Sequence, residues 1–227
     1  MAAGTGTIIE LRLEPDGLSG RISCPPGMRP APGQYLIASG PDPREPLPAV
    51  LFPSRVMEAA IDIAPPLPST WSAGMELTLR GPLGRGFQMP ATTRRVALAS
   101  LDDSPHRLLP LAYHALANNA SVVLYAGSAV RGLPEAVEVL PPDLLPEALS
   151  WADFLALDAQ VYSLGGLRER LGLQDYQRPG CTTQVMVITA MPCSGIAECG
   201  VCAVVTRSGW ALACSDGPVF DFNQLEG

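Results

Sequence analysis

Hydrophobic and polar residues alternate through much of the first 87 residues, with the period of two that is typical of half-buried β-strands. The alternating segments are residues 7–13 and 75–80, and residues 34–38 and 49–52 are short apolar runs. Prolines, glycines and aspartates that favour turns separate them. Short strands divided by frequent turns predict an antiparallel β-barrel, which we assign to residues 1–92.

The pattern changes after residue 92, where buried strands and helices alternate. Strands are expected at 95–101, 121–127, 154–157 and 184–189, and helices at 108–118, 144–148 and 164–171. This order predicts a parallel sheet with crossover helices over residues 93–188. A third segment, 189–227, contains a cysteine-rich loop and a hairpin over 202–214 that turns at Ser208 and Gly209.

Composition and charge narrow the classes of protein that fit. The chain has 227 residues, of which 47% are hydrophobic, and 24 prolines, as expected for a globular protein with short strands and rigid turns. The net charge of -7 and the lack of basic runs argue against nucleic acid or anionic membranes as partners. The N-terminus does not resemble a signal peptide, and no apolar stretch approaches the ~20 residues of a membrane span. We therefore expect a cytoplasmic protein.

Four of the six cysteines lie within the last 35 residues, spaced C-x5-C-x2-C-x11-C: Cys193, Cys199, Cys202 and Cys214. In a reducing compartment, clustered cysteines favour metal ligation over disulfides. Cys24 and Cys181 stand apart and are expected to pack as small apolar side chains. The spacing therefore marks the four clustered thiols as candidate metal ligands.

Three interpretations of this cluster remain open: a [2Fe-2S] centre, a structural zinc site and plain reduced thiols. Plant-type iron–sulfur loops use a similar layout with a distant fourth cysteine, whereas zinc ribbons usually carry two Cys-x2-Cys pairs. Gly195 and Gly200 would let the backbone approach a cluster closely. The chain's two histidines, His106 and His114, lie far away, which disfavours a Rieske-type site.

The segments 191–202 and 213–220 resemble the C-terminal iron–sulfur segment of the electron-transfer subunit of class 1B dihydroorotate dehydrogenase. Residues 32–35 (Pro-Gly-Gln-Tyr) and 74–87 are similar to barrel motifs of the same family. The resemblance implies an FAD-binding barrel, a ferredoxin-reductase-like domain that binds NAD, and a [2Fe-2S] cluster on the four cysteines. It also implies a dihydroorotate dehydrogenase-like catalytic subunit as partner, and a place in pyrimidine biosynthesis.

The flavin motifs of that family are altered in this sequence. The family's arginine-containing strand motif reads Val-Leu-Phe-Pro-Ser-Arg at residues 50–55, and its glycine-rich diphosphate turn is replaced by residues 64–70, which include three prolines without N–H groups. The resemblance leaves Ser54 and the turn residues Gly81, Pro82 and Leu83 as flavin contacts. Both alterations argue against FAD binding.

The nucleotide motifs are altered further. The turn at residues 100–107 has no glycine and places Asp102 and Asp103 where a pyrophosphate would approach a helix N-terminus. We interpret these two acids instead as residues at a helix N-terminus, where their negative charge interacts favourably with the helix dipole. The family's Cys-Gly-Pro element, which closes over the nicotinamide, is replaced by Val-Tyr-Ser-Leu-Gly-Gly at residues 161–166. The sequence therefore predicts that NAD binding is lost.

These observations favour an electron-transfer protein that carries one electron at a time between a partner redox enzyme and a second carrier, and that is not a complete reductase by itself. The alternative is a non-catalytic scaffold or regulatory subunit with a structural four-cysteine zinc site. Trp210, the tryptophan nearest the cluster, is expected to cover the hairpin. The sequence leaves a homodimer open.

Overall fold

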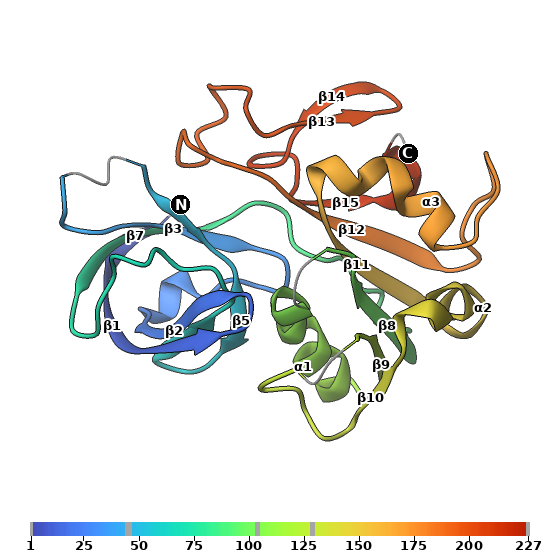
Figure 1. Cartoon of the computed structure of the whole chain (residues 1–227), viewed down its shortest axis with the longest axis horizontal. Coiled ribbons are helices and arrows are strands. Elements are labelled where there is room, and N and C mark those ends of the chain that lie inside the picture. The colour runs from blue at the N-terminus through green and yellow to red at the C-terminus, as the bar shows by residue number, and fades with distance from the viewer. Residues whose placement is uncertain (1, 44–46, 103–104, 128–129, 226–227) are drawn as a thin grey trace.

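The computed structural model describes residues 2–43, 47–102, 105–127 and 130–225. Two sheets make up most of it, one at each side of the molecule in Figure 1, with the β13–β14 hairpin lying above the second sheet. Among the described residues, no helix is long and apolar enough to cross a membrane.

The first sheet is the predicted barrel, nearly closed and antiparallel throughout. Its strands run in the order β4-β3-β7-β1-β2-β6-β5. They are β1 (Ala2–Glu14), β2 (Gly17–Ser23), β3 (Tyr35–Ser39), β4 (Ala49–Leu51), β5 (Pro53–Val56), β6 (Ala60–Ile63) and β7 (Glu76–Leu83), with a 3-10 turn, η1 (Pro26–Met28). The long β1 pairs with β7 through its first half and with β2 through its second. Alternate residues such as Leu77 and Leu79 are fully buried, which explains the period-two pattern.

The second sheet has six strands in the order β10-β9-β8-β11-β12-β15. These are β8 (Arg95–Ser100), β9 (Ser121–Tyr125), β10 (Val137–Leu140), β11 (Phe154–Gln160), β12 (Thr182–Ile188) and β15 (Val219–Asp221). The first five pair in parallel, as predicted, while β15 pairs with β12 antiparallel. Central strands such as β11 are buried on both faces, as a parallel sheet covered by helices requires.

Short helices connect the strands of this second sheet. The one of regular length is α1 (Leu109–Ala117), which follows η2 (Pro105–Leu108). The others are η3 (Pro142–Glu147), α2 (Ala148–Trp151), η4 (Val161–Gly166), α3 (Leu167–Arg170) and η5 (Phe222–Gln224). Helix α1 lies between the two sheets and packs against β5 of the barrel, so it joins the two halves (Figure 1).

The C-terminal segment forms the predicted hairpin and then returns to the second sheet. Strands β13 (Ala203–Thr206) and β14 (Gly209–Leu212) pair antiparallel on either side of Ser208. Strand β15 follows within a few residues of Cys214, and the backbone between them bonds to the end of the barrel, with Arg85 N–H donating to the Gly217 carbonyl. The cysteine-bearing chain is therefore fixed to both sheets.

Candidate metal centre

The loop from Cys193 to Cys202 has an unusual backbone. Ser194, Gly195, Ala197 and Gly200 all have positive φ, between 58° and 71°. For Ser194 and Ala197 this left-handed conformation costs about 1–2 kcal/mol each. Such strain in a short loop between candidate ligands is typical of functional sites, where it turns backbone N–H groups toward a bound group.

The strained loop directs N–H donors at one thiol. Burial raises the pKa of Cys193, but a hydrogen bond from the Cys199 side chain and backbone N–H groups of Glu198, Cys199 and Ile196 outweigh it and bring the pKa down to about 6. Cys193 is therefore largely a thiolate at neutral pH, and the thiolate is the form that ligates metals.

Cys202 and Cys214 are buried, and the Cys214 thiol behaves in the opposite way to Cys193. Burial, the hydrogen bond to Cys202 and the charges of Cys202 and Cys193 raise the pKa of Cys214 to about 12. The charges of Cys193 and Cys202 thus oppose a negative charge on Cys214. A bound cationic centre would turn this mutual repulsion into attraction, because it lowers the pKa of every thiol that ligates it.

The four predicted ligands come together as two pairs, Cys193 with Cys199 and Cys202 with Cys214. Within the described part of the chain, no three His, Cys, Asp or Glu side chains are gathered closely enough to hold a metal ion. Cys24 is buried in the barrel core and Cys181 is half-buried, so neither belongs to the loop. The donor set is therefore four thiols in two pairs, with N–H groups supplied by the loop.

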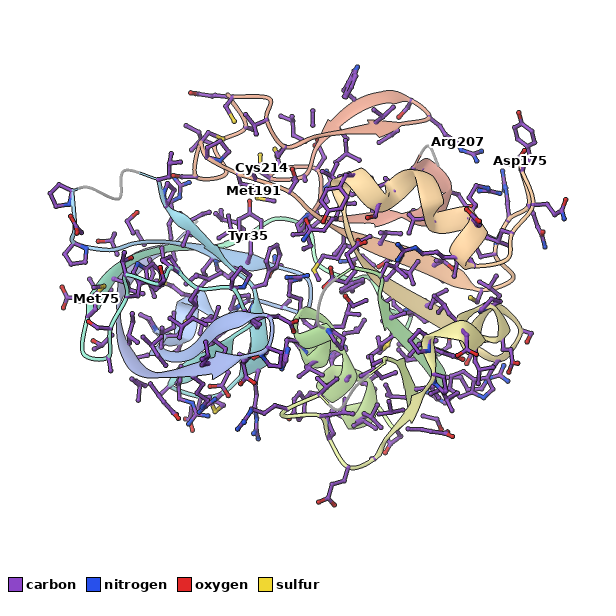
Figure 2. The ribbon with its side chains drawn as sticks, viewed as in Figure 1. Tyr35, Met75, Asp175, Met191, Arg207 and Cys214 are labelled. Carbon is purple, nitrogen blue, oxygen red and sulfur yellow. The ribbon has the colours of Figure 1, made fainter. Side chains whose placement is uncertain are left out.

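The barrel covers this centre from one side. Cys202 and Cys214 share an apolar cluster with Met191 of the loop and with Tyr35 and Leu83 of the barrel. Figure 2 shows Tyr35 extending from the barrel toward Met191 and Cys214. Burial, and then the charges of Cys214, Cys202 and Cys193, raise the pKa of Tyr35 well above its usual value, so its hydroxyl stays protonated. This hydroxyl was not identified from the sequence, although the Pro-Gly-Gln-Tyr motif contains it.

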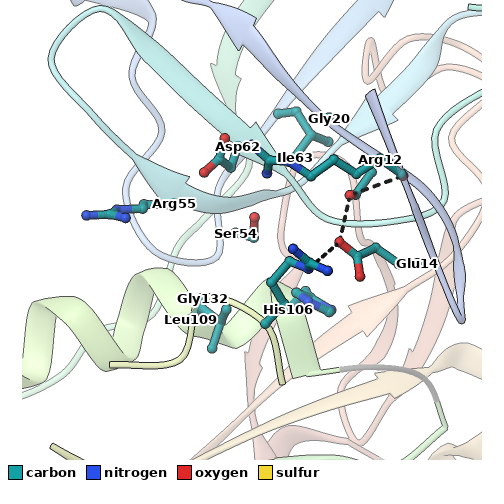
Figure 3. A pocket seen from close by; sticks show the side chains of 12 residues that line it. Arg12, Glu14, Gly20, Ser54, Arg55, Asp62, Ile63, His106, Leu109 and Gly132 are labelled. Atoms are coloured by element: carbon teal, nitrogen blue, oxygen red, sulfur yellow. Dashed lines mark hydrogen bonds and ion pairs between the residues drawn. The ribbon is translucent and has the colours of Figure 1, made fainter. Parts of the chain in front are cut away.

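The residues expected to contact FAD lie at two separate places. Leu83 packs toward the cysteine loop, where a Cβ added at Gly195 would lie 3.4 Å from its Cδ1. Ser54 instead lines a cavity of about 60 Å³ that faces His106 and Leu109 (Figure 3). None of Gly81, Pro82 and Leu83 lines that cavity. The four residues therefore do not surround one flavin-sized space.

Side chains contact one another across the seam between the barrel and the second half of the molecule, although a cavity of about 360 Å³ remains between Arg55, Val56 and Met57 on the barrel side and Pro110, Tyr113 and His114 of helix α1. The Arg55 guanidinium lies over the Tyr113 ring, 5.3 Å from its centroid. Arg131 Nε lies 3.2 Å from the Glu14 carboxylate, which joins the second half of the molecule to β1. Ligand pockets usually exceed about 300 Å³, so the space left beside Ser54 does not fit an isoalloxazine ring.

A larger cleft, about 630 Å³, opens at the carboxyl ends of β8 and β9. Three carboxylates line it, from Glu14, Asp16 and Asp102. Its cationic lining residue Arg131 is paired with Glu14, and burial lowers the pKa of His106, which therefore stays neutral near pH 7. Arg170 also lies 3.7 Å from the Asp102 carboxylate, so two of the three carboxylates are paired with arginines, while the residues that line the cleft carry a net negative charge.

Asp102 also holds a distant segment of the chain. Its carboxylate accepts hydrogen bonds from the Gln160 backbone, at 2.9 Å, and from the Ser163 hydroxyl, at 2.7 Å. It therefore fixes the chain after β11, far away in sequence. Asp103 lies outside the described residues.

A buried ion pair lies just behind this edge of the sheet. Arg107 Nε and Nη2 donate to the two oxygens of Asp158, at 2.8 and 3.3 Å, and both side chains are almost completely buried. The pair joins η2, which precedes helix α1, to strand β11.

The barrel, the parallel sheet with an antiparallel edge strand and the appended cysteine loop define a chain with the ferredoxin-reductase-like fold and a C-terminal iron–sulfur-type segment. Residues 189–226 match the family described as the iron-sulfur cluster binding domain of dihydroorotate dehydrogenase B. The chain is also 26% identical, over 172 residues and 68% of each protein, to the electron transfer subunit of dihydroorotate dehydrogenase B (NAD(+)) from Clostridium perfringens (strain 13 / Type A). The resemblance seen in the sequence is thereby confirmed.

Solved structures agree on the fold. The NADH-dependent reduced ferredoxin-NADP oxidoreductase superposes with a TM-score of 0.77 at 17% identity, covering 97% of this chain and 89% of that one. Phthalate dioxygenase reductase superposes with a TM-score of 0.56 at 12% identity, covering 94% and 77%. At these identities the likeness establishes the fold alone.

Proposed function

We propose that this chain is an electron-transfer protein that holds a [2Fe-2S] cluster on Cys193, Cys199, Cys202 and Cys214 and serves a partner redox enzyme. The observation that carries the proposal is the arrangement of the thiols as two pairs beside inward-pointing N–H groups. When bound, such a cluster accepts and returns one electron at a time. The chain's own residues would ligate it, donate hydrogen bonds to its sulfurs and exclude water.

Two pairs of thiols suit two irons better than one zinc ion. In a [2Fe-2S] centre held by four cysteines, each iron takes two thiolates, whereas structural zinc requires all four within one tetrahedron at about 2.3 Å. The Ile196, Glu198 and Cys199 N–H groups directed at Cys193 add the hydrogen bonds that iron–sulfur sites use to set their potential.

The protein is proposed to work without a flavin or nicotinamide of its own. The space beside Ser54 is too small for a flavin ring, and the cleft at the sheet edge presents three carboxylates where a pyrophosphate would bind. Like charges repel one another, and the repulsion is stronger where they are partly shielded from water. A hydride carries two electrons, so a chain without these cofactors would exchange single electrons with a partner.

That partner is proposed to dock over the cysteine loop. The loop and hairpin expose four apolar side chains, those of Ile196, Val201, Val205 and Trp210, beside the exposed Cys199. Trp210 is 75% exposed and does not cover the hairpin, contrary to expectation. Apolar surface beside a redox centre suits a protein partner, for which we propose a dihydroorotate dehydrogenase-like catalytic subunit.

The test is anaerobic purification or reconstitution with iron and sulfide. The wild-type protein should be reddish-brown and contain about two irons and two sulfides per chain. Cys199→Ser should abolish or strongly alter the visible spectrum, while the control Cys181→Ser, outside the loop, should leave it unchanged. A colourless protein with one zinc ion per chain would refute the proposal.

A further inference from the structure

Tyr35 connects the barrel to the cysteine centre. It is fully buried, and its hydroxyl donates a hydrogen bond to the Cys214 carbonyl oxygen at 3.0 Å. Residues 35 and 214 are 179 positions apart, and the contact joins strand β3 to a proposed ligand.

The surroundings hold this hydroxyl in place. The Tyr35 ring contacts the Phe52 ring, with centroids 5.6 Å apart. A Cβ added at Gly195 would lie 2.8 Å from the Tyr35 hydroxyl oxygen, and one added at Gly84 would lie 2.8 Å from its ring. Because both glycines are needed for this close fit, the tyrosine has little freedom to turn away from Cys214.

We infer that Tyr35 is a positioning residue for the metal centre, and that its hydroxyl dipole raises the reduction potential of the cluster. The inference rests on the proposed function. Reduction adds negative charge, and the partial negative charge of the Cys214 carbonyl opposes it. The hydroxyl hydrogen offsets that carbonyl charge in a water-poor environment, where such effects are large. Hydrogen bonds and burial around the ligands are known determinants of cluster potential.

The first test compares Tyr35→Phe with Tyr113→Phe in cluster-loaded protein. Tyr113 makes the same type of bond at a distant site, donating its hydroxyl to the Gly132 carbonyl at 2.6 Å. Redox titration followed by visible and electron paramagnetic resonance spectra should give a lower potential for Tyr35→Phe and an unchanged one for Tyr113→Phe. A purely structural role would lower the unfolding temperature of Tyr35→Phe and leave its potential at the wild-type value, which would overturn the inference.

A second pair of variants, Gly195→Ala and Gly200→Ala, tests the inference if Tyr35→Phe does not retain the cluster. Gly195 and Gly200 have nearly equal φ angles, 71° and 70°, so alanine imposes similar strain at both. A Cβ at Gly195 would collide with the Tyr35 hydroxyl, whereas one at Gly200 would meet nothing within 4 Å. Gly195→Ala should therefore lower the potential relative to Gly200→Ala, and equal potentials would contradict the role of Tyr35.

These outcomes separate the two proposals. If the wild-type protein takes up no iron and sulfide, the proposed function fails before any variant is compared. If it does take them up and neither pair of variants differs in potential, the function stands and the role of Tyr35 is refuted.

Discussion

Cys193 shows how one residue is tuned by its neighbours. Its sequence position marks it as a candidate ligand, but its thiolate character depends on N–H donors from Ile196, Glu198 and Cys199, which converge only because Ser194 and Ala197 adopt positive φ. Spacing predicts which cysteines cluster. It does not predict the strained backbone, since neither serine nor alanine signals a left-handed conformation.

In the metal-free protein, the pKa of about 6 predicts that Cys193 reacts with iodoacetamide at neutral pH, with its rate rising through pH 6. Burial raises the pKa of Cys181, which should react appreciably only in alkaline solution. Peptide mapping by mass spectrometry across pH 5–9 would measure both rates side by side. Identical pH dependence for the two cysteines would show that the loop does not stabilise the thiolate.

At the level of elements, strands with a clear hydrophobic pattern were predictable and the others were not. Alternation or apolar runs identified β1, β3, β4 and β7 of the barrel, buried runs identified β8, β9, β11 and β12 of the second sheet, and the hairpin over 202–214 was correct. Strand β2, with seven residues, was missed. Strand β15 has only three residues, and pairing with β12 rather than local sequence makes it a strand. The bonds from Asp102 to Gln160 and Ser163 likewise depend on chain brought together by the parallel sheet.

The junction between β7 and the chain before β15 yields a prediction at this scale. A Cβ at Gly84 would lie 2.6 Å from Pro218 and 2.9 Å from the Gly217 carbonyl, whereas one at Gly74 would meet nothing within 4 Å. Both glycines have positive φ, 75° and 85°. Gly74→Ala should cost about 1–2 kcal/mol from backbone strain alone, and Gly84→Ala should cost about 1–3 kcal/mol more from overpacking. Urea unfolding measures the loss of unfolding free energy in both variants. Equal losses would show that the junction relaxes to accommodate the added Cβ.

For the whole molecule, the sequence predicted the order of barrel, sheet and cysteine segment, but it did not reveal how the halves meet. The closing contacts pair Arg55 with Tyr113 and Glu14 with Arg131, residues far apart in the chain. The sequence motifs indicated that the flavin contacts at residues 50–55 and 64–70 are altered. Only the assembled structure shows that the cavity beside Ser54 is as small as about 60 Å³.

The small size of the cavity beside Ser54 predicts that added FAD neither binds nor stabilises the protein. A ligand present at a hundred times its dissociation constant stabilises a folded protein by about 2.7 kcal/mol, which for a chain of this size would raise the unfolding temperature by several degrees. We expect no shift with FAD and no retention of flavin after gel filtration. The double variant Arg55→Ala/Tyr113→Ala removes one contact across the seam. Because Glu14 and Arg131 still bridge the seam, the unfolding temperature of this variant should also show no shift with FAD. Stoichiometric yellow flavin in the wild-type protein would mean that the seam opens in solution and that the chain keeps a flavin site.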